Sequence, residues 1–255
     1  MSSDPPPEIP EVPEMVEVPG GAFAMGDLWG DGDPDEQPVR EVAQRPFAMG
    51  RTPVTNGQFL AFLNATRGWR SPHPRDRWAA FPAAPVAGLV RAGPDSFACT
   101  AGFEPFPVVY VSWFGAAAYC AWLSELTGRA FRLPGEVEWQ YAATAGGRLK
   151  WSLGNQFVRS RYHCNASGPA RADLGPESEM GFLHLTGNVF EWSLDEYATS
   201  LDRADPAAAL PGSRVIKGGA FILREPPGLR NSKRFSCVEE SCLNCVGFRV
   251  ARETP

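Results

Sequence analysis

The sequence predicts an α+β fold with an unusually large share of loops. Glycine (26) and proline (25) together make up a fifth of the 255 residues, and aromatic residues make up 11%. This composition is typical of many turns held in place by large buried rings, rather than of a helical bundle. Helical patterns occur before about residue 147, and short strands are predicted after it, at 215–221 and 247–251. The length fits one large domain or two small ones.

The N-terminal region divides at Met15. Residues 1–14 contain five prolines and no hydrophobic periodicity, which predicts a disordered, polyproline-like lead-in. Hydrophobic residues then alternate up to Gly20, which predicts a strand that enters a tight turn, and alternation returns over 39–49. We therefore expect one ordered domain over residues 15–255.

Three helices are predicted from their capping residues. The T-x-x-Q sequence at 55–58 is a capping box that starts the first helix. Ser112 is placed to cap a second helix, which Gly128 ends. The third follows the RLPG sequence at 132–135, with Glu136 in its first turn, where the helix dipole favours a carboxylate.

Charge and hydropathy exclude two classes of partner. Charged residues are 21% of the chain and the formal net charge is −5, so there is no surplus of basic residues to neutralise nucleic-acid phosphates. No apolar run approaches the roughly 18–20 residues that cross a bilayer. Residues 1–20 are acidic and Pro-rich without the apolar core of a signal peptide. We expect a cytoplasmic protein, unless a signal peptide has been removed.

Several segments in register resemble one known family. The chain is similar to the formylglycine-generating enzymes (sulfatase-modifying factors), whose fold is C-type-lectin-like, over about residues 15–252. The segments are FAMGRTPVTNGQF at 47–59, PVVYVSW at 107–113, AYCAWL at 118–123, FRLPGEVEWQYAA at 131–143, LTGNVFEW at 185–192, VIKGGAF at 215–221 and GFRVA at 247–251. The resemblance implies the fold, since such motifs build a scaffold that active and inactive members share.

The chemistry of that family depends on two cysteines that bind copper(I) after a Gly-Gly-Ser-Tyr/Phe strand, and copper(I) is a soft metal that suits sulfur ligands. The matching strand here ends in Gly-Gly-Ala-Phe, with Ala220 in place of the serine. Leu223 and Gly228 hold the two cysteine positions. The resemblance therefore implies that the chain has no copper at the family site and does not form formylglycine.

Three functions are compatible with this pattern. The first is a non-catalytic binding or regulatory module, a pseudoenzyme, that takes a protein, a peptide or a small molecule in a groove formed by the C-terminal loops. The candidate groove residues are Leu223, Arg224, Glu225, Arg230, Arg234 and Phe235. The second is a non-haem iron or copper oxidoreductase of maturation or natural-product biosynthesis, for which the three histidines His73, His163 and His184 are candidate ligands. The third is a variable ligand-binding protein of the same fold.

The resemblance also implies calcium sites. One would use the carbonyls of Gly187 and Val189 and the carboxylate of Glu191, which are hard oxygen ligands. His184 stands where the family has a first ligand, and an imidazole is a poor ligand for calcium. The other site would begin at Asn165, with Asp173 as the nearest downstream carboxylate.

Three closely spaced cysteines are a feature of this chain rather than of the resemblance. Cys237, Cys242 and Cys245 lie within nine residues, a density that is typical of zinc sites. Cys164 or His163 could supply a fourth ligand. A disulfide with one spare thiol, and unremarkable loop cysteines, are the alternatives that the spacing leaves open.

Overall fold

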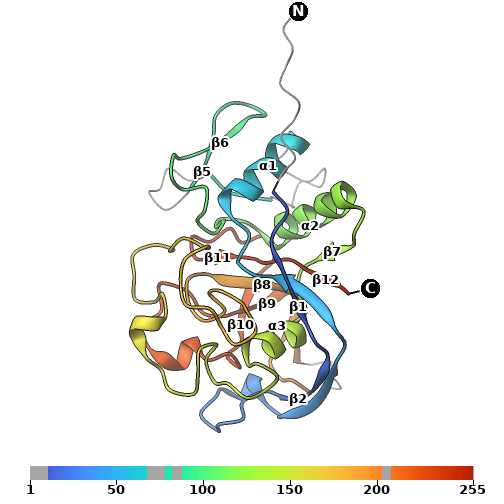
Figure 1. Ribbon diagram of the computed structural model, residues 1–255, viewed down its shortest axis with the longest axis vertical. Coiled ribbons are helices and arrows are strands. Elements are labelled where there is room, and N and C mark those ends of the chain that lie inside the picture. Colours follow the sequence, from blue (N-terminus) through green and yellow to red (C-terminus); the bar gives the residue numbers. More distant parts are fainter. Residues whose placement is uncertain (1–10, 68–77, 82–87, 203–207, 255) are drawn as a thin grey trace, which may run out of the picture.

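The computed structural model describes residues 11–67, 78–81, 88–202 and 208–254. The predicted lead-in falls largely on residues 1–10, which lie outside the described residues, and the first strand begins at Met15. Within this part of the chain the fold is α+β, as predicted, with helices and several small sheets joined by long loops (Figure 1).

Two four-stranded sheets form the centre of the fold. The first has the order β1-β4-β12-β7 and brings the two ends of the domain together; its strands are β1 (Met15–Val18), β4 (Phe47–Gly50), β12 (Ala251–Glu253) and β7 (Phe131–Arg132). The second has the order β10-β9-β8-β11, with β10 (Phe235–Val238), β9 (Ala209–Lys217), β8 (Phe190–Ala198) and β11 (Val246–Gly247). Two hairpins flank the sheets, β2 (Gly21–Met25) with β3 (Arg40–Gln44), and β5 (Leu89–Arg91) with β6 (Phe97–Cys99).

The three predicted helices are present and begin at the predicted residues. In α1 (Asn56–Thr66) the Thr55 hydroxyl accepts from the Gln58 N–H at 3.2 Å and the Gln58 side chain accepts from the Thr55 N–H at 3.0 Å. In α2 (Trp113–Thr127) Ser112 accepts from the Gly115 N–H at 3.1 Å. The third, α3 (Glu136–Ala143), is capped from outside, because the Asp195 carboxylate accepts from its first N–H at 2.6 Å. Short 3₁₀ turns are η1 (Pro34–Glu36), η2 (Arg159–Arg161) and η4 (Pro226–Leu229).

Large rings fill the space between these elements. Phe59 of α1, Tyr119 of α2 and Phe248 pack with ring centroids 5.5–6.1 Å apart. Trp139 and Trp192 are fully buried. Rings of this size bury the most apolar surface per residue, which lets short helices and strands share one stable core.

The structure corrects both predicted C-terminal strands. The strand expected at 215–221 ends at Lys217, because Gly218 and Gly219 have left-handed φ values of 90° and 71°. A Cβ on Gly219 would lie 2.6 Å from Leu229 Cδ2, so glycine is also required there for packing. The strand expected at 247–251 is split, because residues 248–250 carry the chain from β11 in one sheet to β12 in the other.

Candidate functional site

The loop that follows β9 holds the two positions of greatest interest, Leu223 and Gly228. The Leu223 carbonyl accepts a hydrogen bond from the Asn165 N–H at 2.8 Å, which connects this loop to the loop that contains Asn165. A Cβ built on Gly228 would lie 3.2 Å from Leu223 Cδ1 and 4.0 Å from Leu223 Cδ2. The side chain of Leu223 therefore lies directly over Gly228 and fills the space that a side chain there would use.

Leu223 belongs to a small apolar cluster at this edge of the fold. Its buried members are Trp151, Tyr162 and Leu229, and Cys164 packs beside them. Next to the cluster, Arg159 donates to the Arg224 carbonyl at 2.6 Å, so η2 and the loop after β9 lie side by side at the left of Figure 1. The site around Leu223 is thus a packed apolar surface with arginines at its margin.

The predicted groove is wrong at two of its residues. Arg230 donates to both carboxylate oxygens of Glu36, at 2.6 and 2.8 Å, and Arg234 donates to those of Glu136, at 2.6 and 3.2 Å. Both arginines are at most 4% exposed, because each is paired with a carboxylate inside the protein. They therefore belong to the interior of the fold.

The remaining groove residues do not form one surface. Leu223, Arg224 and Glu225 are consecutive and partly or fully exposed. Phe235 is half-buried in β10, where its ring packs on Phe190 at 4.9 Å. Phe235 therefore stabilises the second sheet.

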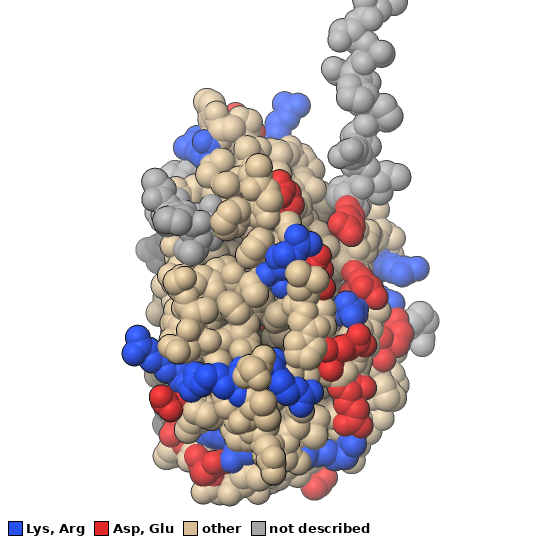
Figure 2. Space-filling view, turned by 60° about the vertical axis from the view of Figure 1, so that its left-hand side comes forward, with Lys and Arg blue, Asp and Glu red and all other residues tan. Residues whose placement is uncertain are grey.

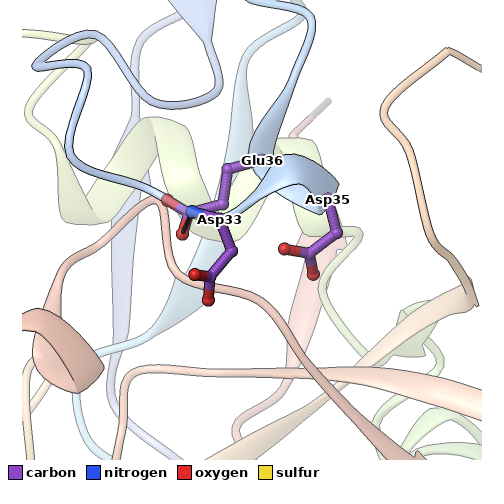
Figure 3. Close-up of side chains that lie close together, drawn as sticks. All are labelled: Asp33, Asp35 and Glu36. Carbon is purple, nitrogen blue, oxygen red and sulfur yellow. Dashed lines mark hydrogen bonds between the residues drawn. The ribbon is translucent and has the colours of Figure 1, made fainter.

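An acidic cluster that the sequence analysis missed surrounds η1. The carboxylates of Asp33, Asp35 and Glu36 lie within 4.8 Å of one another, the one such grouping of ligand atoms among the described residues (Figure 3). Each carboxylate already has a partner: Lys233 for Asp33, the Tyr197 hydroxyl at 2.7 Å for Asp35, and Arg230 for Glu36. Two of these carboxylates are paired with basic side chains and the third accepts from a hydroxyl, so the protein itself balances much of the negative charge of the cluster.

A buried lysine lies in the same ionic network. Lys217 is fully buried at the end of β9, with its ammonium 3.1 Å from the Ser232 carbonyl and 3.9 Å from the Glu136 carboxylate. Burial lowers the pKa of Lys217 to about 8, although Glu136 opposes this shift. The sequence analysis did not predict that Lys217 is buried and paired, because its partners Glu136 and Ser232 are remote in sequence.

Several of the residues expected to bind calcium have partners within the protein. Both oxygens of Glu191 accept from the Arg249 guanidinium at 2.6 Å, and one also accepts from the Trp139 indole at 2.7 Å. Asp173 pairs with its neighbour Arg171 at 2.6 Å, and the Asn165 N–H is bonded to the loop at Leu223. Val189 is buried, and the N–H of Gly187 donates to the Gly218 carbonyl at 2.8 Å. The guanidinium takes the place of a cation at Glu191, so this donor set does not fit calcium.

The three C-terminal cysteines do not form a metal-ligand cluster among the residues that the structure describes. None of the six cysteines of the chain forms a disulfide. Cys237 and Cys245 are buried, whereas Cys242 is half-buried and its thiol lies 3.7 Å from the Glu240 carbonyl. The three sulfur atoms do not come together within ligand distance in the described part of the chain. Burial raises the pKa of Cys245 to about 11, which disfavours the thiolate that zinc requires.

Two of the three histidines line one cavity of about 280 Å³ between η2 and the loop at 170–186. His163 bonds to the Gly168 carbonyl at 2.8 Å, and Nε2 of His184 bonds to the carbonyls of Leu174, at 2.7 Å, and Arg171, at 3.1 Å. The sequence analysis proposed these histidines as candidate iron ligands from separate parts of the chain. It did not predict that two of them line the same cavity. His73 lies outside the described residues.

Stability is expected to fall in acid because of His184. Burial, together with the charges of Arg249 and His163, lowers its pKa from 6.5 to about 4, against the opposing hydrogen bonds to Leu174 and Arg171. Between these values the unfolded chain binds a proton that the folded protein does not. The free energy of unfolding should therefore decrease as the pH falls from about 6.5 to 4, by up to about 1.4 kcal/mol per pH unit from this group. Urea unfolding across this range measures the slope, and His184→Gln should reduce it; an equal slope in both proteins would contradict the assignment.

The α+β fold, with three helices and several small sheets joined by long loops, is the fold that the resemblance to the formylglycine-generating enzymes predicted. Comparison with known proteins agrees. The family model described as "Sulfatase-modifying factor enzyme 1-like domain" matches residues 2–254, and the chain belongs to this family. No helix among the described residues combines the length and the apolar character needed to cross a membrane.

Individual relatives cover most of the chain. It is 32% identical to a formylglycine-generating enzyme of Thermomonospora curvata, over 94% of this chain and 93% of that protein. It is 31% identical to a Bos taurus protein named "Inactive C-alpha-formylglycine-generating enzyme 2", over 93% of this chain and 87% of that protein. The structure of PvdO from Pseudomonas aeruginosa is similar with a TM-score of 0.74 and 27% identity, over 95% of both chains.

Proposed function

We propose that the chain is a non-catalytic member of its family, in which the fold serves as a binding or regulatory module. The observation that carries this proposal is the contact between Leu223 and Gly228. These are the two positions where the family resemblance places copper-binding cysteines. An isobutyl group packed over a glycine offers no ligand atom and no redox chemistry, so copper does not fit here.

The names of two relatives support the same proposal. The Bos taurus and Mus musculus proteins, 31% and 32% identical to this chain, are both named as inactive formylglycine-generating enzymes. Inactive members that keep the whole domain indicate that the fold is retained for a role other than the formation of formylglycine. The catalytic relative from Thermomonospora curvata is as similar overall, so identity alone does not decide the function.

The surface that replaces the catalytic site suits a protein or peptide partner. Ile222 is 46% exposed beside Leu223, and Val158 of the neighbouring loop is 45% exposed. Arg159 and Arg224 lie at the margin of these apolar side chains, and Arg159 is held in place through the Arg224 carbonyl. Apolar side chains rimmed by arginine are the composition that protein interfaces favour.

The proposal is tested by assaying the purified protein for formylglycine formation on a C-x-P-x-R peptide, with and without copper(I). We expect no product above a control without enzyme, because Leu223 and Gly228 supply no sulfur ligand. The Thermomonospora curvata relative, assayed in parallel, shows that the conditions support turnover. Product formed by this chain at a rate that depends on copper would overturn the proposal.

A further inference from the structure

The cavity of about 280 Å³ beside η2 adjoins the apolar cluster at Leu223, with which it shares Leu153 and Tyr162, but neither Leu223 nor Gly228 lines it. Its polar lining includes Ser152, Ser160, Arg161, Tyr162, His163 and His184, and no carboxylate lines it in the described part of the chain. Leu153, Leu174 and Pro176 supply apolar walls. In size it lies at the small end of the range for ligand pockets, and it combines apolar walls with a few polar groups as such pockets do.

Arg161 is the charged group of the cavity and is held in position. One of its N–H groups donates to the Leu153 carbonyl at 2.9 Å, which fixes the guanidinium at the end of η2. It makes no ion pair with a carboxylate in the described ranges, although its side chain is exposed. A guanidinium has five N–H donors in a fork that matches an oxyanion, so donors remain for a ligand.

Tyr162 supplies a second donor that lacks an acceptor. The residue is 8% exposed, and its ring stacks on Phe157 with centroids 4.9 Å apart and an angle of 11°. The hydroxyl oxygen lies near the main chain of Leu153, but its proton meets no acceptor within hydrogen-bond distance among the described residues. Arg161 and Tyr162 are consecutive residues, and both line the cavity. A buried hydroxyl without an acceptor costs free energy that a ligand oxygen would recover.

Basic side chains gather on the face of the molecule that carries η2 (Figure 2). Figure 2 shows a row of Lys and Arg side chains across the face that comes forward from the left of Figure 1, where η2 and η4 lie. Arg159 and Arg224 on this side are exposed, and neither forms an ion pair with a carboxylate in the ranges that the structure describes. A cluster of one sign at the mouth of a concave site raises the local concentration of ligands of the opposite sign.

From these observations we infer that the cavity beside η2 binds a small oxyanion, a carboxylate, phosphate or sulfate group, through the Arg161 guanidinium and the Tyr162 hydroxyl. A cation is disfavoured, because the lining has no carboxylate and its one full charge is positive. Nε2 of His184 is directed to the carbonyls of Leu174 and Arg171, so this nitrogen is not available to a metal. The inference stands whether or not the protein is catalytic, since it does not use the contact between Leu223 and Gly228 that carries the proposed function.

The experiment is a titration followed by the imidazole signals in a proton–carbon NMR spectrum. The chain has three histidines, so the spectrum is simple, and His163→Gln and His184→Gln assign the two cavity signals. The probes are inorganic phosphate, sodium sulfate and sodium benzoate at a constant ionic strength set with chloride. Benzoate tests a carboxylate with an apolar body, and the other two test a tetrahedral anion. We expect saturable shifts of the His163 and His184 signals with at least one probe.

Variants separate a specific site from general charge. Arg161→Gln should weaken binding by about tenfold or more, because it removes a charge-assisted hydrogen bond, and Tyr162→Phe should weaken it by about threefold or more. Arg148→Gln removes the same charge from an exposed arginine that pairs with Glu179 outside the cavity, and it should change the affinity by less than about twofold. If no probe produces a saturable shift, or if Arg161→Gln and Arg148→Gln have the same effect, the inference is wrong.

Discussion

Replacement of Arg249 by methionine is expected to lower the free energy of unfolding by about 3–5 kcal/mol. The guanidinium is fully buried, donates to both oxygens of Glu191 at 2.6 Å, and also donates to the carbonyls of Gly50 and Leu183 at 2.8 and 3.0 Å. Methionine fills much of the same volume, but among the described residues it leaves the buried Glu191 carboxylate with the Trp139 indole as its one remaining side-chain donor. An uncompensated buried charge is the reason for the large effect.

The matched control is Arg252→Met, three residues further along the chain. Arg252 pairs with Glu17 at 2.6 Å, but the Glu17 side chain is 58% exposed, so this loss should be about 1 kcal/mol or less. Urea unfolding of both variants gives the comparison, and the double variant with Glu191→Leu should recover part of the loss by removing the unpaired carboxylate. A loss below about 1 kcal/mol for Arg249→Met would show that Glu191 has another partner. A melting temperature of Arg249→Met that rises in millimolar calcium over excess chelator, with no rise in the double variant with Glu191→Leu, would identify that partner as calcium.

The local features of the fold could be predicted from the sequence, whereas the pairing of charges could not. The capping box at 55–58 and the cap at Ser112 depend on residues three apart, so spacing alone reveals them. The partner of Arg230 is Glu36, which is 194 residues away, and no spacing indicates it. From the sequence alone, Arg230 and Arg234 are therefore predicted to be exposed. Only the structure shows that Glu36 and Glu136 pair with them inside the protein.

The partners of the predicted metal ligands could not be predicted for a related reason. A ligand motif lists residues that can bind a metal, but each listed group can also be satisfied by the protein itself. Glu191 is satisfied by Arg249, and Cys245 is buried in the core. The cavity beside η2 escaped prediction because Arg161 and His184 meet there from separate loops. Cytoplasmic localisation stays a prediction.

The double variant Leu223→Cys with Gly228→Cys is expected to bind about one more copper(I) ion per chain than either single variant. Copper(I) prefers sulfur ligands, and two thiolates that face each other suffice to hold it. The structure places these positions face to face, since a Cβ at 228 would lie 3.2 Å from Leu223 Cδ1. Replacement of leucine by cysteine removes the two Cδ methyl groups, so the space that they occupy becomes available to the new side chain at 228. Gly228 does not have the left-handed φ that would penalise a side chain.

The single variants are necessary controls because the native chain already has six cysteines, of which Cys164 packs close to Leu223. Copper bound in competition with a chromogenic copper(I) chelator should rise by about one ion per chain in the double variant relative to Leu223→Cys, which measures any pairing of the new thiol with Cys164. The extra copper should be lost in acid, because both thiols must lose a proton to bind it. If the double variant binds no more copper than Leu223→Cys, the two positions do not face each other. The loop at 223–228 would then differ from the family in its backbone as well as in two side chains, and the catalytic geometry of the family could not be restored at these positions.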